Sequence, residues 1–70
     1  MTPEQVQRAV KKNRAYIVEV FTASLQESYP HTKAESVEAA IASWERKEPP
    51  QGIIELFVHG WLNTGTSAHA

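Results

Sequence analysis

Glu55 and His59 are the first side chains in this sequence whose types and spacing could support chemistry. They stand four residues apart in a segment with helical periodicity, so both fall on one helical face. Such a pair can act as an acid and a base or contribute to a metal site, but a metal needs three or four ligands. The other histidines, His31 and His69, lie in a turn and near the end of the chain. We therefore expect an exposed hydrogen-bonded pair and no metal site.

Nucleophilic catalysis finds little support in the sequence. There is no cysteine, and no serine stands in the Gly-x-Ser-x-Gly elbow typical of α/β-hydrolases. The three glycines are too widely spaced to form a loop around a phosphate. A chain of 70 residues also has little room for a walled pocket of about 300 Å³ or more. We expect no enzymatic activity, no cofactor and no small-molecule substrate.

A basic cluster is the third candidate, formed by Arg8, Lys11, Lys12 and Arg14. Cations this close together could contact phosphates. Arg8 and Lys11 share a helical face, whereas Lys12 and Arg14 point to either side of it. The net charge of the chain is −1, and no pattern of base-reading side chains accompanies the cluster. A solvated surface is the favoured interpretation, and nucleic-acid binding by the basic cluster is the alternative.

The candidate residues must be positioned by helices, and the longest is predicted over residues 2–28. Thr2 can cap this helix, Pro3 suits its first position, and Gln5 completes a Thr-x-x-Gln capping box. Alternating steps of four and three residues then define a short heptad-like seam of Val6, Val10, Asn13, Ile17, Val20 and Ser24.

This seam predicts self-association, because a chain of 70 residues without disulfides buries little surface on its own. We expect a homodimer whose interface includes a buried Asn13 at its middle, since a lone Asn in such a seam selects the register. The predicted interface residues are Val6, Val10, Asn13, Ile17, Val20 and Phe21.

Two shorter helices are predicted after Pro30. Residues 32–35 form a Thr-x-x-Glu capping box, from which a helix should run to about Lys47. Its helical spacing places one apolar stripe in the core: Val37, Ala40, Ile41 and Trp44. Residues 51–63 could be a short strand, but their polar positions recur every fourth residue and no second strand is available, so we predict a helix.

The predicted third helix is apolar on most sides, which indicates burial on most sides. Two other helices cannot cover it completely, so a second copy or another protein should do so. Gly60, beside Trp61, would let another backbone approach closely. The predicted partner-binding residues are Ile54, Phe57, Val58 and Trp61.

Together these patterns predict an all-α fold: a small three-helix domain over residues 1–65, forming a homodimeric helical bundle, with a flexible tail over residues 66–70. The composition, 41% hydrophobic and 21% charged, is that of a globular protein, and no apolar run could span a bilayer. The N-terminal residues have no basic start and no apolar signal core, which favours the cytoplasm. We expect a small adaptor, regulator or inhibitor that acts by binding another protein.

Overall fold

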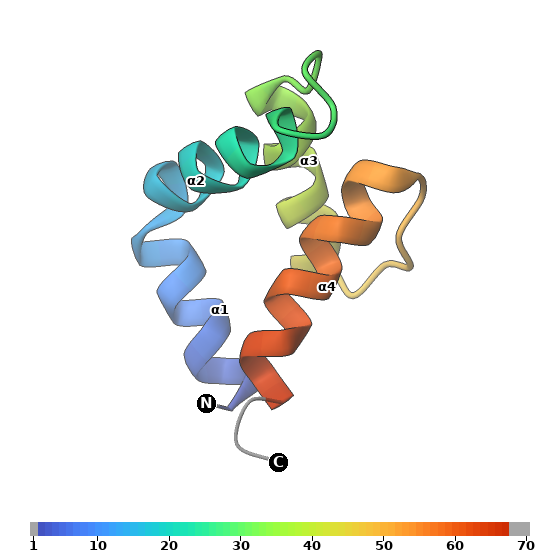
Figure 1. Ribbon diagram of the computed structural model, residues 1–70. Coiled ribbons are helices and arrows are strands. Elements are labelled where there is room, and N and C mark those ends of the chain that lie inside the picture. The colour runs from blue at the N-terminus through green and yellow to red at the C-terminus, as the bar shows by residue number, and fades with distance from the viewer. Residues whose placement is uncertain (1, 68–70) are drawn as a thin grey trace.

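The chain is all-helical in the computed structural model, which describes residues 2–67 and the side chains through residue 64. The described residues form four helices: α1 (Pro3–Lys12), α2 (Arg14–Gln26), α3 (Ala34–Glu45) and α4 (Ile53–Ser67). The chain turns sharply between α1 and α2, and α4 brings it back beside α1 (Figure 1). The predicted all-α class is confirmed, as is the helix predicted over residues 51–63.

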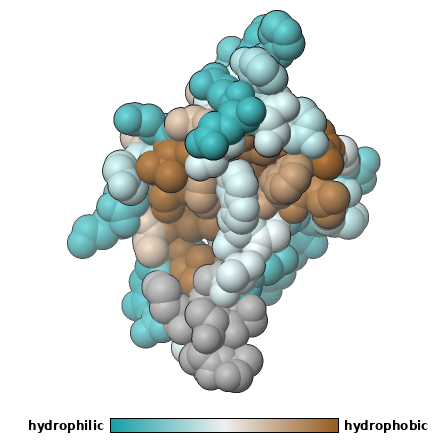
Figure 2. All heavy atoms as spheres, viewed as in Figure 1, coloured by the Kyte–Doolittle hydropathy of each residue, from teal (hydrophilic) through white to brown (hydrophobic). Residues whose placement is uncertain are grey.

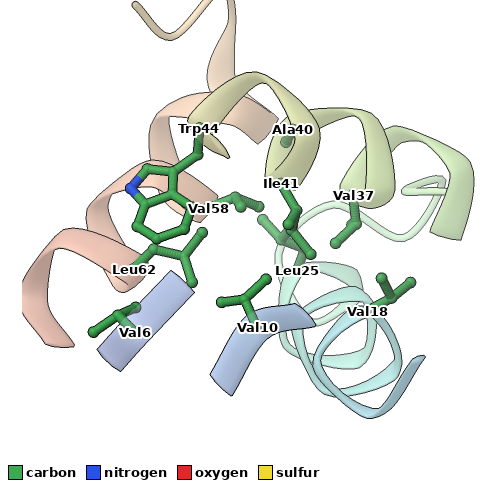
Figure 3. Close-up of a cluster of buried hydrophobic side chains, with 10 residues drawn as sticks. All are labelled: Val6, Val10, Val18, Leu25, Val37, Ala40, Ile41, Trp44, Val58 and Leu62. Carbon is green, nitrogen blue, oxygen red and sulfur yellow. The ribbon is translucent and has the colours of Figure 1, made fainter. Parts of the chain in front are cut away.

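All four helices contribute to a single hydrophobic core. Val37, Ala40, Ile41 and Trp44 of α3 are buried in it, as their spacing predicted. Side chains from α1, α2 and α4 converge on this stripe (Figure 3). They are Val6 and Val10 from α1, Val18 and Leu25 from α2, and Val58 and Leu62 from α4.

The prediction of one uninterrupted helix over residues 2–28 is wrong, because the helix breaks at Asn13. The backbone N–H and the side-chain Nδ2 of Asn13 both donate to the carbonyl oxygen of Ala9, at 2.9 and 3.0 Å. Asn13 is exposed and has φ −115° and ψ 28°, outside the helical region. Asparagine is a poor residue for a helix interior and competes with it through such local bonds.

The two predicted capping boxes have opposite outcomes. Thr2 and Gln5 form the reciprocal pair of hydrogen bonds at the start of α1, so this box is confirmed. The box predicted at residues 32–35 is wrong: the N-cap of α3 is Lys33, which makes no side-chain cap bond. The hydroxyl of Thr32 instead donates to the carbonyl oxygen of Tyr29, at 2.7 Å, and closes the turn between α2 and α3.

Two residues with positive φ shape the connection from α3 to α4. Lys47, at φ 61°, follows the α3 C-cap, and two backbone bonds close the turn there, from Lys47 N–H to Trp44 and from Glu48 N–H to Ser43. This is the Schellman pattern, in which glycine is the usual residue at the Lys47 position. Gly52, at φ 104°, precedes α4, and its carbonyl accepts from the Leu56 N–H.

The helix that follows is longer than predicted. Thr64 and Gly65 do not end α4, which continues through Ser67. Two residues of the predicted flexible tail are therefore helical, and residues 68–70 lie outside the described part of the chain. Within residues 2–67, no helix has the length and apolar character needed to cross a membrane.

Candidate protein-binding surface

Four aromatic side chains form a continuous row that joins α2 to α4. The ring of Phe21 lies 4.9 Å from that of Trp61, centroid to centroid. Trp61 lies 6.0 Å from Phe57, one helical turn away on α4, and Phe57 lies 6.1 Å from Tyr29, just after α2. All three ring pairs are tilted, at distances within the range favoured by aromatic contacts. We call Phe21, Trp61, Phe57 and Tyr29 the aromatic row.

The aromatic row lies at the surface of the molecule. Phe21 packs against the core, but Tyr29, Phe57 and Trp61 are 40%, 39% and 36% exposed. Hydrophobic residues gather across the middle of the face shown in Figure 2, with hydrophilic residues at its upper and left edges. Large aromatic side chains that are partly held by their neighbours and partly exposed are typical of binding surfaces.

The outward face of α4 continues this surface. Ile53, Leu56, Phe57, Gly60 and Trp61 follow helical spacing along it. Ile53 and Leu56 are 44% and 56% exposed, and Gly60 is exposed as well. We call these five residues the α4 face. The only described residues of α4 with ionisable side chains, Glu55 and His59, lie on its other side, against α3.

The predicted partner-binding residues therefore divide into two groups. Phe57 and Trp61 are at the surface, Ile54 is partly buried against the core, and Val58 is fully buried and does not contribute to this surface. The aromatic row also contains two residues that the sequence did not assign to partner binding. Phe21 is one of the predicted dimer-interface residues, and Tyr29 lies between helices, where helical periodicity carries no information.

The predicted dimer seam does not form a surface. Val6 and Val10 are core residues, and Asn13 is exposed and bonded to its own helix. After the break, α2 turns Val18, Thr22 and Leu25 inward and leaves Val20 39% exposed. Ile17 and Phe21 pack at the edge of the core. The predicted dimer interface of Val6, Val10, Asn13, Ile17, Val20 and Phe21 is thus not one continuous face.

Glu55 and His59 are not an exposed pair, because both contact a buried hydroxyl of α3. The Oγ of Ser43 lies 2.7 Å from Glu55 Oε1 and 2.8 Å from His59 Nε2, and His59 is 5% exposed. The same His59 nitrogen lies 3.2 Å from the carbonyl oxygen of Ala40. Glu55 and His59 therefore face α3, and the prediction of an exposed pair is wrong. Asn63, one turn further along α4 and itself exposed, accepts a bond from Trp44 Nε1, at 2.9 Å.

These three side chains include the residue types of a serine–histidine–acid triad, but their geometry differs from one. In a triad the carboxylate holds the histidine nitrogen opposite the serine. Here Glu55 approaches the nitrogen that already faces Ser43, at 3.9 Å, and accepts from the serine itself. The Ser43 hydroxyl has one hydrogen and two oxygen acceptors within reach, Glu55 Oε1 at 2.7 Å and the Ala40 carbonyl oxygen at 2.9 Å. Glu55 therefore does not hold His59 from the side opposite the serine, as the acid of a triad does.

Catalytic sequence motifs do not identify Ser43 as a functional residue. A usable signal was present: Ser43 stands three residues after Ala40 and directly before Trp44, on the buried side of α3. A hydroxyl on a buried stripe needs a hydrogen-bond partner, and the only polar stripe of the following helix offered one. Within the described residues, no three His, Asp or Glu side chains come together as a possible metal site.

The basic cluster is divided by the structure. Arg14 Nη1 lies 2.8 Å from Glu45 Oε1, and this partly buried ion pair joins α2 to α3. Arg8, Lys11 and Lys12 are exposed. Arg8 and Lys11 border a shallow groove that is also lined by Glu4 and Glu45. Acidic side chains therefore stand among the cations that would have to contact phosphates.

A second ion pair, between Arg46 and Glu48, lies at the end of α3. The Arg46 Nε donates to Glu48 Oε2 at 2.9 Å, and this hydrogen bond lowers the pKa of the Glu48 carboxyl below its ordinary value. Both side chains are exposed, so solvent screens the pair.

Comparisons with protein families, with curated protein sequences and with solved structures find no significant match for this chain. The assignment of a function therefore depends on the surface chemistry described above.

Proposed function

We propose that this protein is a small non-enzymatic adaptor, regulator or inhibitor that binds another protein through the aromatic row. The observation that carries this proposal is the row itself. Three aromatic rings, each more than a third exposed, contact one another in sequence, from Tyr29 in the turn after α2 to Phe57 and Trp61 of α4. Partly exposed aromatic side chains provide much of the binding energy in protein interfaces, since they bury a large area at a small cost in side-chain entropy.

The row is already ordered before a partner arrives. Phe21 is held by the core, and Trp61 packs 4.9 Å from it. A preorganised surface loses less conformational entropy on binding than a flexible one, which favours affinity. An apolar surface of this kind should also bind with little dependence on salt, because few charges are neutralised on binding.

The alternative, nucleic-acid binding through the basic cluster, has less support. Arg14 is engaged by Glu45, and the groove beside Arg8 and Lys11 contains two carboxylates. A phosphate backbone would be repelled by these carboxylates as well as attracted by the cations. The two functions differ in the effect of salt, since phosphate contacts release counterions and weaken steeply as salt rises.

The test is capture of a binding partner by the immobilised protein, followed by measurement of the affinity for the captured species. The change Trp61→Ser should weaken binding at least about tenfold, as expected for an aromatic residue at the centre of an interface. Tyr29→Ser, outside α4, should also weaken it. Tyr16→Ser is the matched control, because Tyr16 is 68% exposed and contributes to no ring contact in the aromatic row.

A nucleic acid as the captured species would overturn the proposal. So would a protein whose binding is unaffected by Trp61→Ser and Tyr29→Ser but is lost in the double variant Lys11→Ala, Lys12→Ala. Raising salt from about 50 to 200 mM should change the affinity by less than about threefold, whereas loss of several phosphate contacts would reduce it about 1,000-fold or more.

A further inference from the structure

The α4 face carries a protruding side chain and a gap one helical turn apart. Leu56, at 56% exposed, is the most exposed large apolar residue of the described part of α4. Gly60 follows four residues later on the same ridge and has no side chain. A Cβ placed on Gly60 would meet no atom within 4 Å among the described residues beyond its immediate helix neighbours, so the space above it is open.

We infer that the α4 face binds a second copy of this chain in an antiparallel arrangement, with Leu56 seated over the partner subunit's Gly60. A twofold axis perpendicular to α4, midway between Leu56 and Gly60, places each leucine above the other subunit's glycine. The contact of Leu56 with the partner subunit's Gly60 is therefore made twice in the dimer. The missing side chain at Gly60 lets the two helices approach closely, as small residues do at helix crossings.

The charge distribution on α4 favours a second copy as the occupant. A twofold axis brings like residues close to one another, so a charge near the axis would face the same charge on the other subunit. The α4 face is Ile53, Leu56, Phe57, Gly60 and Trp61, none of them charged. Glu55, the acidic residue of α4, is turned inward to Ser43. The face therefore has no like-charge repulsion against itself and no charged group to select a charged partner.

The apolar area of the face is a large part of the apolar area that a dimer interface buries. Four of its side chains, Ile53, Leu56, Phe57 and Trp61, are between 36% and 56% exposed. At about 200 Å² for each fully exposed side chain, they offer roughly 350 Å² of apolar surface per subunit. A standard interface buries about 800 Å² per partner, of which somewhat more than half is apolar. The α4 face thus supplies most of the apolar share.

This inference does not rest on the proposed function, although the two surfaces share Phe57 and Trp61. A second copy and another protein would compete for these two residues. Self-association is measured on the isolated protein, and Leu56 and Gly60 lie outside the aromatic row. If the protein proves to be a monomer, the proposed function is therefore unaffected. If no protein partner is captured, the inferred dimer is likewise unaffected.

The test is sedimentation equilibrium of the full chain at concentrations up to about 100 μM, far above a micromolar dissociation constant. We expect a monomer–dimer equilibrium. Gly60→Leu places a side chain against the partner subunit's Leu56 and should weaken the dimer at least about tenfold. We expect the folded subunit to accept this change, because a Cβ at Gly60 meets no atom within 4 Å among the described residues around it. Leu56→Ala removes the protruding side chain and should also weaken the dimer.

The double variant Leu56→Ala, Gly60→Leu makes the test specific. It exchanges the protrusion and the gap, so the new leucine at position 60 meets the small residue at position 56 of the partner subunit, and dimerisation should recover toward the wild-type value. Tyr16→Ser, on α2, is the control that should leave it unchanged. A wild-type monomer at about 100 μM would overturn the inference. A double variant weaker than both single variants would overturn it as well, because the two positions would then not face each other.

Discussion

The hydroxyl of Ser43 is the residue-scale feature on which the packing of α3 against α4 depends. It contacts Glu55 and His59 at 2.7 and 2.8 Å, and both Ser43 and His59 are 5% exposed. Hydrogen bonds between buried polar groups are directional, so they fix how two helices slide and rotate against each other more strictly than apolar contacts do. Trp44 and Asn63 add a second polar contact between the same two helices.

Removing this hydroxyl should therefore destabilise the fold. Ser43→Ala leaves the buried His59 nitrogen with the Ala40 carbonyl alone and deprives Glu55 of its 2.7 Å donor. We expect the free energy of unfolding in urea to fall by about 1–3 kcal/mol. Ser36→Ala is the matched control on the same helix, because Ser36 is exposed, and it should change the value by less than about 0.5 kcal/mol. Equal unfolding midpoints for the two variants would contradict the role given to Ser43.

At this scale the sequence predicted which residues are polar but not which way they face. The stripe of Glu55, His59 and Asn63 could point to solvent or to a helix with matching polar groups, and periodicity is the same in both cases. The stripe faces α3 because Ser43, a serine on the buried side of that helix, needs a hydrogen-bond partner. The aromatic row shows the same limit: Phe57 and Trp61 were recognised, but Tyr29 joins them only through tertiary folding.

At the scale of the elements, the helix boundaries depend on a few backbone positions. The connection between α3 and α4 holds Lys47 and Gly52 in left-handed conformations, at φ 61° and 104°. A residue with a side chain is strained there by about 1–2 kcal/mol, whereas glycine is not. Lys47 thus carries a strain that Gly52 avoids.

The two positions should respond to substitution in opposite directions. Gly52→Ala should lower the free energy of unfolding by about 1–2 kcal/mol, and backbone strain alone is responsible because an added Cβ meets no atom within 4 Å. Lys47→Gly should raise it by up to about 1 kcal/mol. Thermal and urea unfolding followed by circular dichroism measure both. A stabilising Gly52→Ala would show that the turn does not require the left-handed conformation.

The existence and type of the helices were predictable from the sequence, but the break at Asn13 was not. The apolar stripe that begins with Val6 and Val10 continues through Ile17 and Val20 if the helix is straight, and through Val18 if it bends. The local sequence fits both geometries equally well. The bent helix is formed because it turns Val18 into the core that contains Val37 and Ile41. Thr2 capped its helix as predicted, whereas at Thr32 a bond to Tyr29 within the turn replaced the cap.

On the scale of the whole molecule, helices from both ends of the chain contribute side chains to one core. One face of α4 nevertheless remains exposed. Val58 and Leu62 of α4 are buried, yet Leu56 is more than half exposed. The prediction that the last helix exceeds what its neighbours can cover therefore agrees with the exposed α4 face.

The packing of α1 beside α4 also determines the order in which this protein can fold. Val6 of α1 and Leu62 of α4 belong to the same core, and α1 contacts α4 although most of the chain lies between them (Figure 3). By contrast, α3 and α4 are joined by a short loop. Closing a long loop costs more entropy than closing a short one, so contacts distant in sequence tend to form late. We expect Val6→Ala to accelerate unfolding in stopped-flow experiments while the refolding rate stays nearly constant. A proportional slowing of refolding would place α1 in the folding nucleus instead.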